Sequence, residues 1–232
     1  TDYYDGPANF AESFFAGYKP EEDKPFFLYL SFMNPHDICY GAGFDPRFPD
    51  KLRPHQIAAT QKYIDFHKTL SEEEYRNQIP PVPANMEPNG AYAEMKEIGS
   101  GSRNWTEEQW NFYRWMYCRL VEDVEKQIGR ILTALADAGL ADNTIVVFTS
   151  DHGEMGQSHG LVFKSQLLEE ATCTPLIIAG PGIQKGIVDS ENLTCGIDLV
   201  PTMCDLVGIP IPKGLLGKSL KPILTGQSVK MS

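Results

Sequence analysis

Apolar runs that end in polar clusters recur along this chain. Residues 145–148 are Ile-Val-Val-Phe and precede Thr149-Ser-Asp151, and residues 25–30 are Pro-Phe-Phe-Leu-Tyr-Leu and precede Asn34-Pro-His36. A third run covers Leu176–Ala179. A strand covered on both faces needs no polar alternation, so each run predicts a buried strand, and such strands are typical of parallel sheets.

Between the first two runs lies the best-specified helix of the sequence, predicted from Thr106 to Ala138. Thr106 and Gln109 form a capping-box pattern at its start, and Gly139 is placed to end it. A strand, a helix and a strand in that order predict a right-handed crossover, and hence an α/β fold with a mainly parallel sheet sandwiched by helices. Apolar residues recur along the helix at helical spacing and are expected to be buried, among them Leu120, Val124, Ile128 and Leu135.

The remaining segments are connections and ends. Residues 41–104 are rich in Gly, Pro and charge, with little periodicity, and form an irregular excursion. Such an excursion is either a functional wall over a pocket or a tolerated surface insertion. Residues 1–24 predict a surface lead-in, and a further helix is predicted at 198–208. The tail at 209–232 is interpreted as leading toward a C-terminal subdomain.

The composition limits the class of partner. The chain has 232 residues, of which 42% are hydrophobic, so it can bury a substantial core. Its net charge of -11 argues against a nucleic-acid partner, since phosphate binding favours clustered Lys and Arg. No apolar run approaches the roughly 20 residues that span a bilayer. The five cysteines are scattered and odd in number, so we expect most of them to be free thiols.

Candidate site residues follow the predicted strands. In open α/β sheets, ligands bind beyond the carboxyl ends of the strands, so polar groups gathered there indicate a site. The plain alternative is a polar loop that happens to contain two histidines. The candidates are five residues of one loop and a histidine presented by a proline-fixed turn: Asp151, His152, Glu154, His159 and Lys164, and His36.

Several motifs together resemble the sulfatases of the alkaline phosphatase superfamily. Each motif alone is weak, but their order and spacing are those of the family. The resemblance covers nearly the whole chain apart from residues 40–105, and it implies an alkaline-phosphatase-like fold. The motifs are residues 25–36, residues 129–132 with 144–154, Lys164 with Glu169-Glu170, residues 174–178, and residues 197–202 with Gly208-Ile-Pro and Gly217-Lys-Ser-Leu220.

The resemblance implies roles for four residues. Asp151 and His152 match the pair that completes a divalent metal site, normally calcium, although a hard cation prefers oxygen and many sulfatases have Asn where this chain has His152. His36 matches the histidine that contacts the sulfate ester or its leaving oxygen. Lys164 matches the lysine that neutralises the sulfate. His159 is a possible further site residue, for which a hydrogen-bonded loop histidine is the simpler interpretation.

Two features of the family are absent from this sequence. Such sulfatases carry a formylglycine made from Cys or Ser in a Cys/Ser-x-Pro-x-Arg motif, and an Asp-Asp pair that holds the metal. Cys173-Thr-Pro175 is a near match, but Ile177 stands where Arg is required. We therefore interpret residues 1–232 as a partial catalytic domain whose formylglycine lies outside this chain, and we expect this polypeptide alone to be inactive.

The resemblance implies a metal-dependent sulfuric ester hydrolase that acts on a sulfated carbohydrate or an aryl sulfate. Two alternatives stay open. One is a phosphomonoester or phosphonate monoester hydrolase of the same superfamily, and the other is a non-catalytic carbohydrate-binding relative. The resemblance alone also suggests a periplasmic or secreted location.

Overall fold

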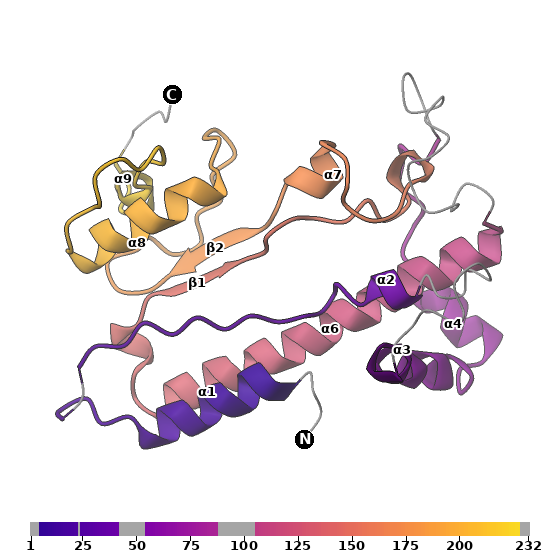
Figure 1. Ribbon diagram of the computed structural model, residues 1–232, viewed down its shortest axis with the longest axis horizontal. Coiled ribbons are helices and arrows are strands. Elements are labelled where there is room, and N and C mark those ends of the chain that lie inside the picture. Colours follow the sequence, from indigo (N-terminus) through magenta and orange to yellow (C-terminus); the bar gives the residue numbers. More distant parts are fainter. Residues whose placement is uncertain (1–4, 23, 42–53, 88–104, 228–232) are drawn as a thin grey trace. The chain divides into compact units, whose positions relative to one another are not determined.

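The computed structural model describes residues 5–22, 24–41, 54–87 and 105–227. They form two compact units, one within residues 1–139 and 152–173 and the other within residues 140–151 and 174–232. Figure 1 shows the elements in chain order along the colour bar. The helices are α1 (Gly6–Gly17), α2 (Ile38–Gly41), α3 (Pro54–His67), α4 (Glu72–Gln78), α6 (Glu107–Asp137), α7 (Glu169–Thr172), α8 (Leu199–Val207) and α9 (Lys221–Leu224); the strands are β1 (Val146–Thr149) and β2 (Leu176–Ala179); and the 3-10 helices are η4 (Ala141–Asn143), η5 (Ser158–Gly160) and η6 (Gly196–Asp198).

Helix α6 confirms the best-specified prediction of the sequence. Gln109 N donates to Thr106 Oγ1 at 3.3 Å and Thr106 N donates to Gln109 Oε1 at 2.8 Å, so the capping box is present in both directions. Leu120 and Leu135 are buried, and Val124 and Ile128 are half-buried. The predicted stripe therefore faces the interior, where α6 packs against α1 and α2.

The predicted surface lead-in at residues 1–24 is wrong, because most of it is helix α1, which lies along α6 in Figure 1. Ala8 and Ala11 are fully buried, which small side chains allow at a close helix contact. Arg130 of α6 donates from Nε to Glu12 Oε1 at 2.8 Å. Alanines carry a weak hydrophobic signal, so the apolar face of this helix does not stand out in the sequence pattern.

The two described strands confirm strands near residues 145–148 and at Leu176–Ala179, but they pair antiparallel and are not buried as predicted, since Phe148 and Ile177 are exposed. Val146 lies opposite Ala179, and Thr149 lies opposite Leu176. Within the described residues, the prediction of a mainly parallel sheet is therefore wrong. An apolar run favours a strand, but it carries no information on the direction of the neighbouring strand or on which elements cover its faces.

The strand predicted at residues 25–30 is extended, but it pairs with no described residue. Its side chains still alternate as in a strand: Phe26 is half-buried, whereas Phe27 and Tyr29 are 77% and 79% exposed. The Phe26 ring packs edge-on against Phe14, at 5.2 Å between centroids. A strand needs a hydrogen-bonded neighbour, and the pattern of a single segment cannot show whether one is present.

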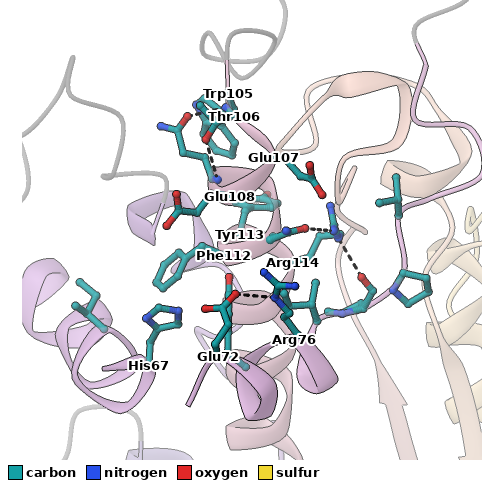
Figure 2. A pocket seen from close by; sticks show the side chains of 18 of the residues that line it. His67, Glu72, Arg76, Trp105, Thr106, Glu107, Glu108, Phe112, Tyr113 and Arg114 are labelled. Atoms are coloured by element: carbon teal, nitrogen blue, oxygen red, sulfur yellow. Dashed lines mark hydrogen bonds and ion pairs between the residues drawn. The ribbon is translucent and has the colours of Figure 1, made fainter. Parts of the chain in front are cut away.

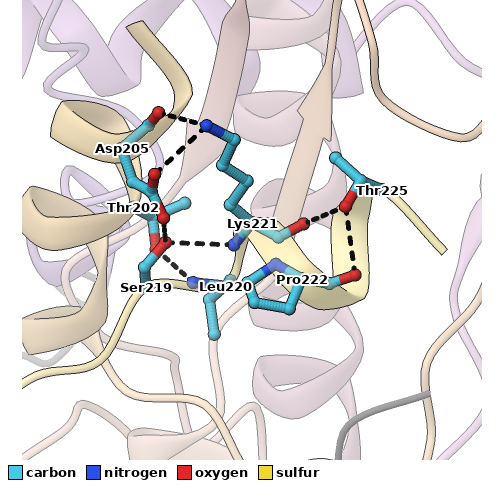
Figure 3. A network of polar contacts seen from close by, with 7 residues as sticks. All are labelled: Thr202, Asp205, Ser219, Leu220, Lys221, Pro222 and Thr225. Atoms are coloured by element: carbon cyan, nitrogen blue, oxygen red, sulfur yellow. Dashed lines mark hydrogen bonds and ion pairs between the residues drawn. The ribbon is translucent and has the colours of Figure 1, made fainter. Parts of the chain in front are cut away.

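In the second unit, α9 is tied to α8 by the polar network of Figure 3. Lys221 Nζ donates to the backbone oxygen of Asp205 at 2.7 Å and to Asp205 Oδ1 at 3.1 Å. Ser219 Oγ donates to Asp205 Oδ2 at 2.7 Å, and Leu220 N donates to the buried Thr202 Oγ1 at 2.9 Å. Helix α8 confirms the helix predicted at 198–208, and these bonds fix part of the tail against it.

Two expectations from composition can be compared with the described residues. None of the helices in the described part of the chain is long and apolar enough to cross a membrane. All five cysteines are free thiols, as their scattered positions predict.

Candidate active site

The loop at residues 152–173 folds back on itself within the first unit. Gly153 N donates to Ala171 O at 2.9 Å, and Met155 N donates to Phe163 O at 2.9 Å. These bonds join the two arms of the loop and give it a defined shape. A small apolar cluster fills it, made of Met155, Leu161 and Ala171, with Leu168 packed alongside.

Three residues of this loop other than glycine have left-handed backbones. They are Gln157 at φ 86°, His159 at φ 55° and Phe163 at φ 69°. Each such residue costs on the order of 1–3 kcal/mol and persists only where its surroundings hold it. Arg114 of α6 donates a hydrogen bond from Nη1 to Gln157 Oε1, and His159 N donates to Asn85 O at 2.8 Å. Backbone strain clustered in this way is typical of functional loops.

Glu154 connects this loop to helix α6. Its Oε1 atom accepts a hydrogen bond of 2.7 Å from the Tyr113 hydroxyl and one of 2.5 Å from Phe163 N. Lys164, the next residue, is half-buried. Lys164 therefore directly follows a residue, Phe163, whose backbone N–H is connected to helix α6 through the Glu154 carboxylate.

His36 lies in a turn that leads into α2. The Asn34–Pro35 peptide bond is cis, and His36 N donates to Met33 O at 3.0 Å. His36 Nδ1 lies 3.4 Å from Oδ1 of the buried Asp37, while 40% of the His36 side chain is exposed. The turn thus presents the imidazole at the surface with a carboxylate beside one ring nitrogen, as predicted for a residue that follows a proline-fixed turn.

The turn before α2 and the loop that holds Lys164 share one hydrophobic core. Ile38, the first residue of α2, and Val162 from the loop are both fully buried in the same cluster, which is built on α6. Charges from the two segments also meet at the Cys39 thiol. Burial raises the pKa of Cys39, the Lys164 ammonium lowers it, and the Glu154 carboxylate raises it. The first unit therefore brings these two predicted site segments together.

Asp151 and His152 fall in different units of the structure. Asp151 is exposed and follows β1 in the second unit, whereas His152 is half-buried in the first. His152 Nδ1 lies 2.9 Å from Gly153 O, and since a carbonyl only accepts, Nδ1 carries the proton. In the neutral ring Nε2 is then the basic nitrogen, the form that a metal ligand requires.

The described residues do not by themselves assemble a complete metal centre. Nowhere among them do three or more His, Cys, Asp or Glu side chains gather as a metal site would require. Asp151 and His152 fit part of a ligand set, because a carboxylate suits a hard cation and an imidazole with basic Nε2 suits many divalent metals. They remain the predicted metal ligands.

His159 has the surroundings of a structural histidine. Its Nε2 atom lies 3.4 Å from Asn85 Nδ2 and 3.9 Å from Glu170 Oε1, and its side chain is 14% exposed. Burial opposes ionisation of Glu170, but hydrogen bonds from its own backbone, Asn85 and Ser158 outweigh it and lower its pKa. These contacts agree with the interpretation of His159 as a hydrogen-bonded loop residue.

A cavity of about 1190 Å³ lies in the same unit, between α4 and the start of α6. Figure 2 shows Arg76 paired with Glu72 on one side, while Glu107 and Glu108 come from the first turn of α6. The Arg76 Nε to Glu72 Oε1 distance is 2.6 Å, so that cation is already paired. Neither His36 nor Lys164 lines this cavity, so it is separate from the predicted site segments.

Two features of the site were missed by reasoning from sequence. The sequence indicates Glu154 only as a candidate, and it does not predict the hydrogen bond from Tyr113 of α6 to Glu154. The bond between them joins residues 41 positions apart. The left-handed Phe163 carries no sequence signal, since glycine or asparagine is the usual indicator of that conformation.

The chain shares the alkaline-phosphatase-like fold of its structural relatives, which include a 2-O GAG sulfatase. A family model described as Sulfatase matches residues 8–209. The chain belongs to the sulfatase family.

Individual relatives agree with this assignment. Arylsulfatase K of Danio rerio is 31% identical over 211 residues, which cover 89% of this chain and 37% of the relative. A Delta 4,5-hexuronate-2-O-sulfatase of Bacteroides thetaiotaomicron is 32% identical, over 90% of this chain and 42% of the relative. The solved structure of a 2-O GAG sulfatase matches with a TM-score of 0.73 and 30% identity, over 98% of this chain and 46% of that one. The chain thus spans about two fifths of the length of these curated relatives.

Proposed function

We propose that this chain is part of a sulfuric ester hydrolase that acts on sulfated carbohydrates. The single observation that carries the proposal is the placement of the His36 turn and the Lys164 loop on one core, which supplies an imidazole and an ammonium from segments that match sulfatase motifs. The carbohydrate substrate is proposed from the hexuronate sulfatase and the GAG sulfatase among the relatives.

Hydrolysis of a sulfate ester joins a water oxygen to sulfur, breaks the ester S–O bond and leaves a proton on the departing alcohol. Charge builds on the sulfate oxygens and on the leaving oxygen as that bond breaks. In our proposal Lys164 neutralises the sulfate oxygens, and His36 donates a hydrogen bond to the leaving oxygen. Fixed cations and donors aimed at developing charge are often the largest contribution to such catalysis.

The proposal includes a divalent metal, calcium by family resemblance, for which Asp151 and His152 supply two ligands. The metal would polarise the sulfate group, and a formylglycine outside these residues would supply the nucleophile. Calcium takes six to eight oxygen ligands, so two side chains account for a minority of its coordination. We also propose a periplasmic or secreted location, which cell fractionation would test.

The test uses the longest natural polypeptide that contains these 232 residues. It is assayed with a 2-O-sulfated unsaturated disaccharide, an aryl sulfate, an aryl phosphate and a phenyl phosphonate monoester. We expect the sulfated disaccharide to be hydrolysed best, and Lys164→Ala to lower kcat/KM by about 10²–10³-fold, as the loss of one charge-stabilising group does.

Other outcomes point to the alternatives. A higher kcat/KM for the phosphorus esters identifies a phosphomonoester or phosphonate monoester hydrolase. Turnover of none of the four esters, combined with binding of the sulfated disaccharide in calorimetry, identifies a non-catalytic carbohydrate-binding relative.

A further inference from the structure

We propose that Glu154 and Tyr113 are positioning residues that set the location of the Lys164 ammonium. This inference rests on the proposed role of Lys164 in neutralising the sulfate. It concerns the bonds that hold the lysine in place rather than the lysine itself.

The first step of the argument is the geometry at Phe163. One carboxylate oxygen of Glu154 accepts from Phe163 N at 2.5 Å, and Phe163 O accepts from Met155 N at 2.9 Å. Both peptide groups of Phe163 are therefore bonded, which holds an L-residue at φ 69° against its own preference. The direction in which the chain leaves Phe163 determines where Lys164 points.

The second step is the anchor that holds Glu154. Its carboxylate oxygen also accepts from the Tyr113 hydroxyl at 2.7 Å, and Tyr113 is 3% exposed on α6. The Tyr113 ring lies 5.5 Å from the Trp105 ring and 6.1 Å from the Trp110 ring. Burial, together with the neighbouring Glu154 charge, raises the pKa of Tyr113 well above its ordinary value, so the hydroxyl stays protonated and donates.

The third step is the consequence for Lys164. Two hydrogen bonds connect Tyr113 of α6 to the Glu154 carboxylate and that carboxylate to the backbone of Phe163, the residue before Lys164. A lysine has four rotatable side-chain bonds, and its charge neutralises a sulfate only if its backbone starts from the right place. A displacement of about 1 Å far from the chemistry can cost on the order of 10²-fold in rate, so the anchor should matter for turnover.

The experiment compares variants in the longest natural polypeptide that contains this chain. Glu154→Ala removes the acceptor, and Glu154→Gln keeps an amide oxygen that can accept both bonds without the charge. We expect Glu154→Ala to lower kcat by about 10–100-fold with a smaller change in KM, and Glu154→Gln to recover most of that loss. Tyr113→Phe removes only the anchoring hydroxyl, and we expect a loss of about 3–10-fold.

Two matched controls accompany these variants. Tyr75→Phe deletes a hydroxyl in the same core cluster that has no hydrogen-bond partner among the described residues, and Glu125→Ala deletes an exposed carboxylate of α6. Both should retain kcat within about twofold. If the Glu154→Ala protein fails to fold, Tyr113→Phe is the deciding variant, because the Tyr113→Phe substitution removes one atom from an otherwise intact core.

A double-mutant cycle distinguishes positioning from a direct catalytic role. If Glu154 acts through Lys164, then Glu154→Ala should cost less than about twofold in a Lys164→Ala background. An equal loss in both backgrounds, or a Glu154→Gln variant as impaired as Glu154→Ala, would overturn the inference.

A second readout separates this inference from the proposed function. The rate at which acetic anhydride modifies Lys164 is measured by peptide mass spectrometry in the unmodified sequence, Glu154→Ala and Tyr113→Phe. We expect at least a threefold change in both variants and none in the two controls. If no sulfate ester is hydrolysed, the proposed function fails and the kinetic comparison cannot be made. The modification rates then decide the positioning inference, which fails if they are unchanged.

Discussion

The side-chain amide of Asn85 donates a hydrogen bond of 2.5 Å to Glu170, 85 positions further along the chain. The backbone oxygen of Asn85 also accepts from His159 N at 2.8 Å. Asn85 therefore holds the tip of the loop to a segment far away in the sequence.

We expect Asn85→Ala to lower the free energy of unfolding of the first unit by about 1 kcal/mol, since one hydrogen bond to a charged group is lost at a partly exposed site. Chemical denaturation measures this change. Asn77→Ala on α4 is the control and should be nearly neutral, because the residue is exposed. Equal stability losses for the two variants would contradict the prediction.

Asp123 predicts a dependence of stability on pH. Burial raises its pKa, but hydrogen bonds from Lys62 at 2.7 Å and Tyr63 at 2.5 Å outweigh burial and hold the pKa below its ordinary value. Because the folded pKa is depressed, the contribution to stability is present above the unfolded pKa of about 3.9 and is lost as the pH falls through the folded pKa.

Asp123→Asn should therefore reduce the stability at pH 7 by about 1 kcal/mol and flatten its decline below about pH 4. Thermal unfolding at a series of pH values measures both effects. Asp137→Asn, at the exposed end of α6, serves as the matched control. The prediction fails if the two variants show the same pH profile.

Gly217 predicts a steric effect in the second unit. A Cβ atom at this position would lie 2.0 Å from the backbone oxygen of Ile197, which cannot move aside as a flexible side chain would. We expect Gly217→Ala to cost about 1–3 kcal/mol, as overpacking does. Gly196→Ala meets nothing within 4 Å and should cost far less. Urea denaturation of the two variants decides whether the close approach matters.

These 232 residues alone should show no sulfatase activity. The sequence contains no Cys/Ser-x-Pro-x-Arg motif, and Asp151 with His152 provides too few ligands for calcium. The assay uses this polypeptide with an aryl sulfate and added calcium, and Lys164→Ala as the background. Turnover above that background would require a nucleophile among the residues present.

The same polypeptide should self-associate. Phe27 and Tyr29 are exposed on an extended segment that pairs with no described residue, and such segments template pairing with other chains. Light scattering should give a mass above 25.9 kDa at micromolar concentration. The double variant Phe27→Glu/Tyr29→Glu should reduce the association, and a monodisperse monomer of the unmodified chain would refute the prediction.

The sequence was informative where structure is local. The start of α6 follows from Thr106 and Gln109 because a capping box depends on residues three apart, and the bounds of β2 follow from its apolar run. Pairing of strands is not local, so neither the direction of the sheet nor the lack of a described partner for residues 25–30 could be predicted.

For the site, too, the sequence predicts local features but not long-range contacts. Short motifs predict His36 and Lys164 as site residues, and the structure shows that their segments share one core through Ile38 and Val162. The bond from Tyr113 to Glu154 depends on how a distant helix meets the loop. The positive φ of Phe163 accompanies the hydrogen bonds of its N to Glu154 and of its O to Met155, and the residue type does not favour it, so no sequence rule identifies it.

The three left-handed residues of the loop at 152–173 have a consequence for its motion. The conformational strain in these backbones is relieved when the surrounding hydrogen bonds break. The strain therefore lowers the free energy required for local opening of the loop. Amide hydrogens near Phe163 should therefore exchange with solvent through a sub-global opening, well before those in the middle of α6 exchange. The segment that carries the proposed catalytic lysine would then open more readily than the helix on which it packs.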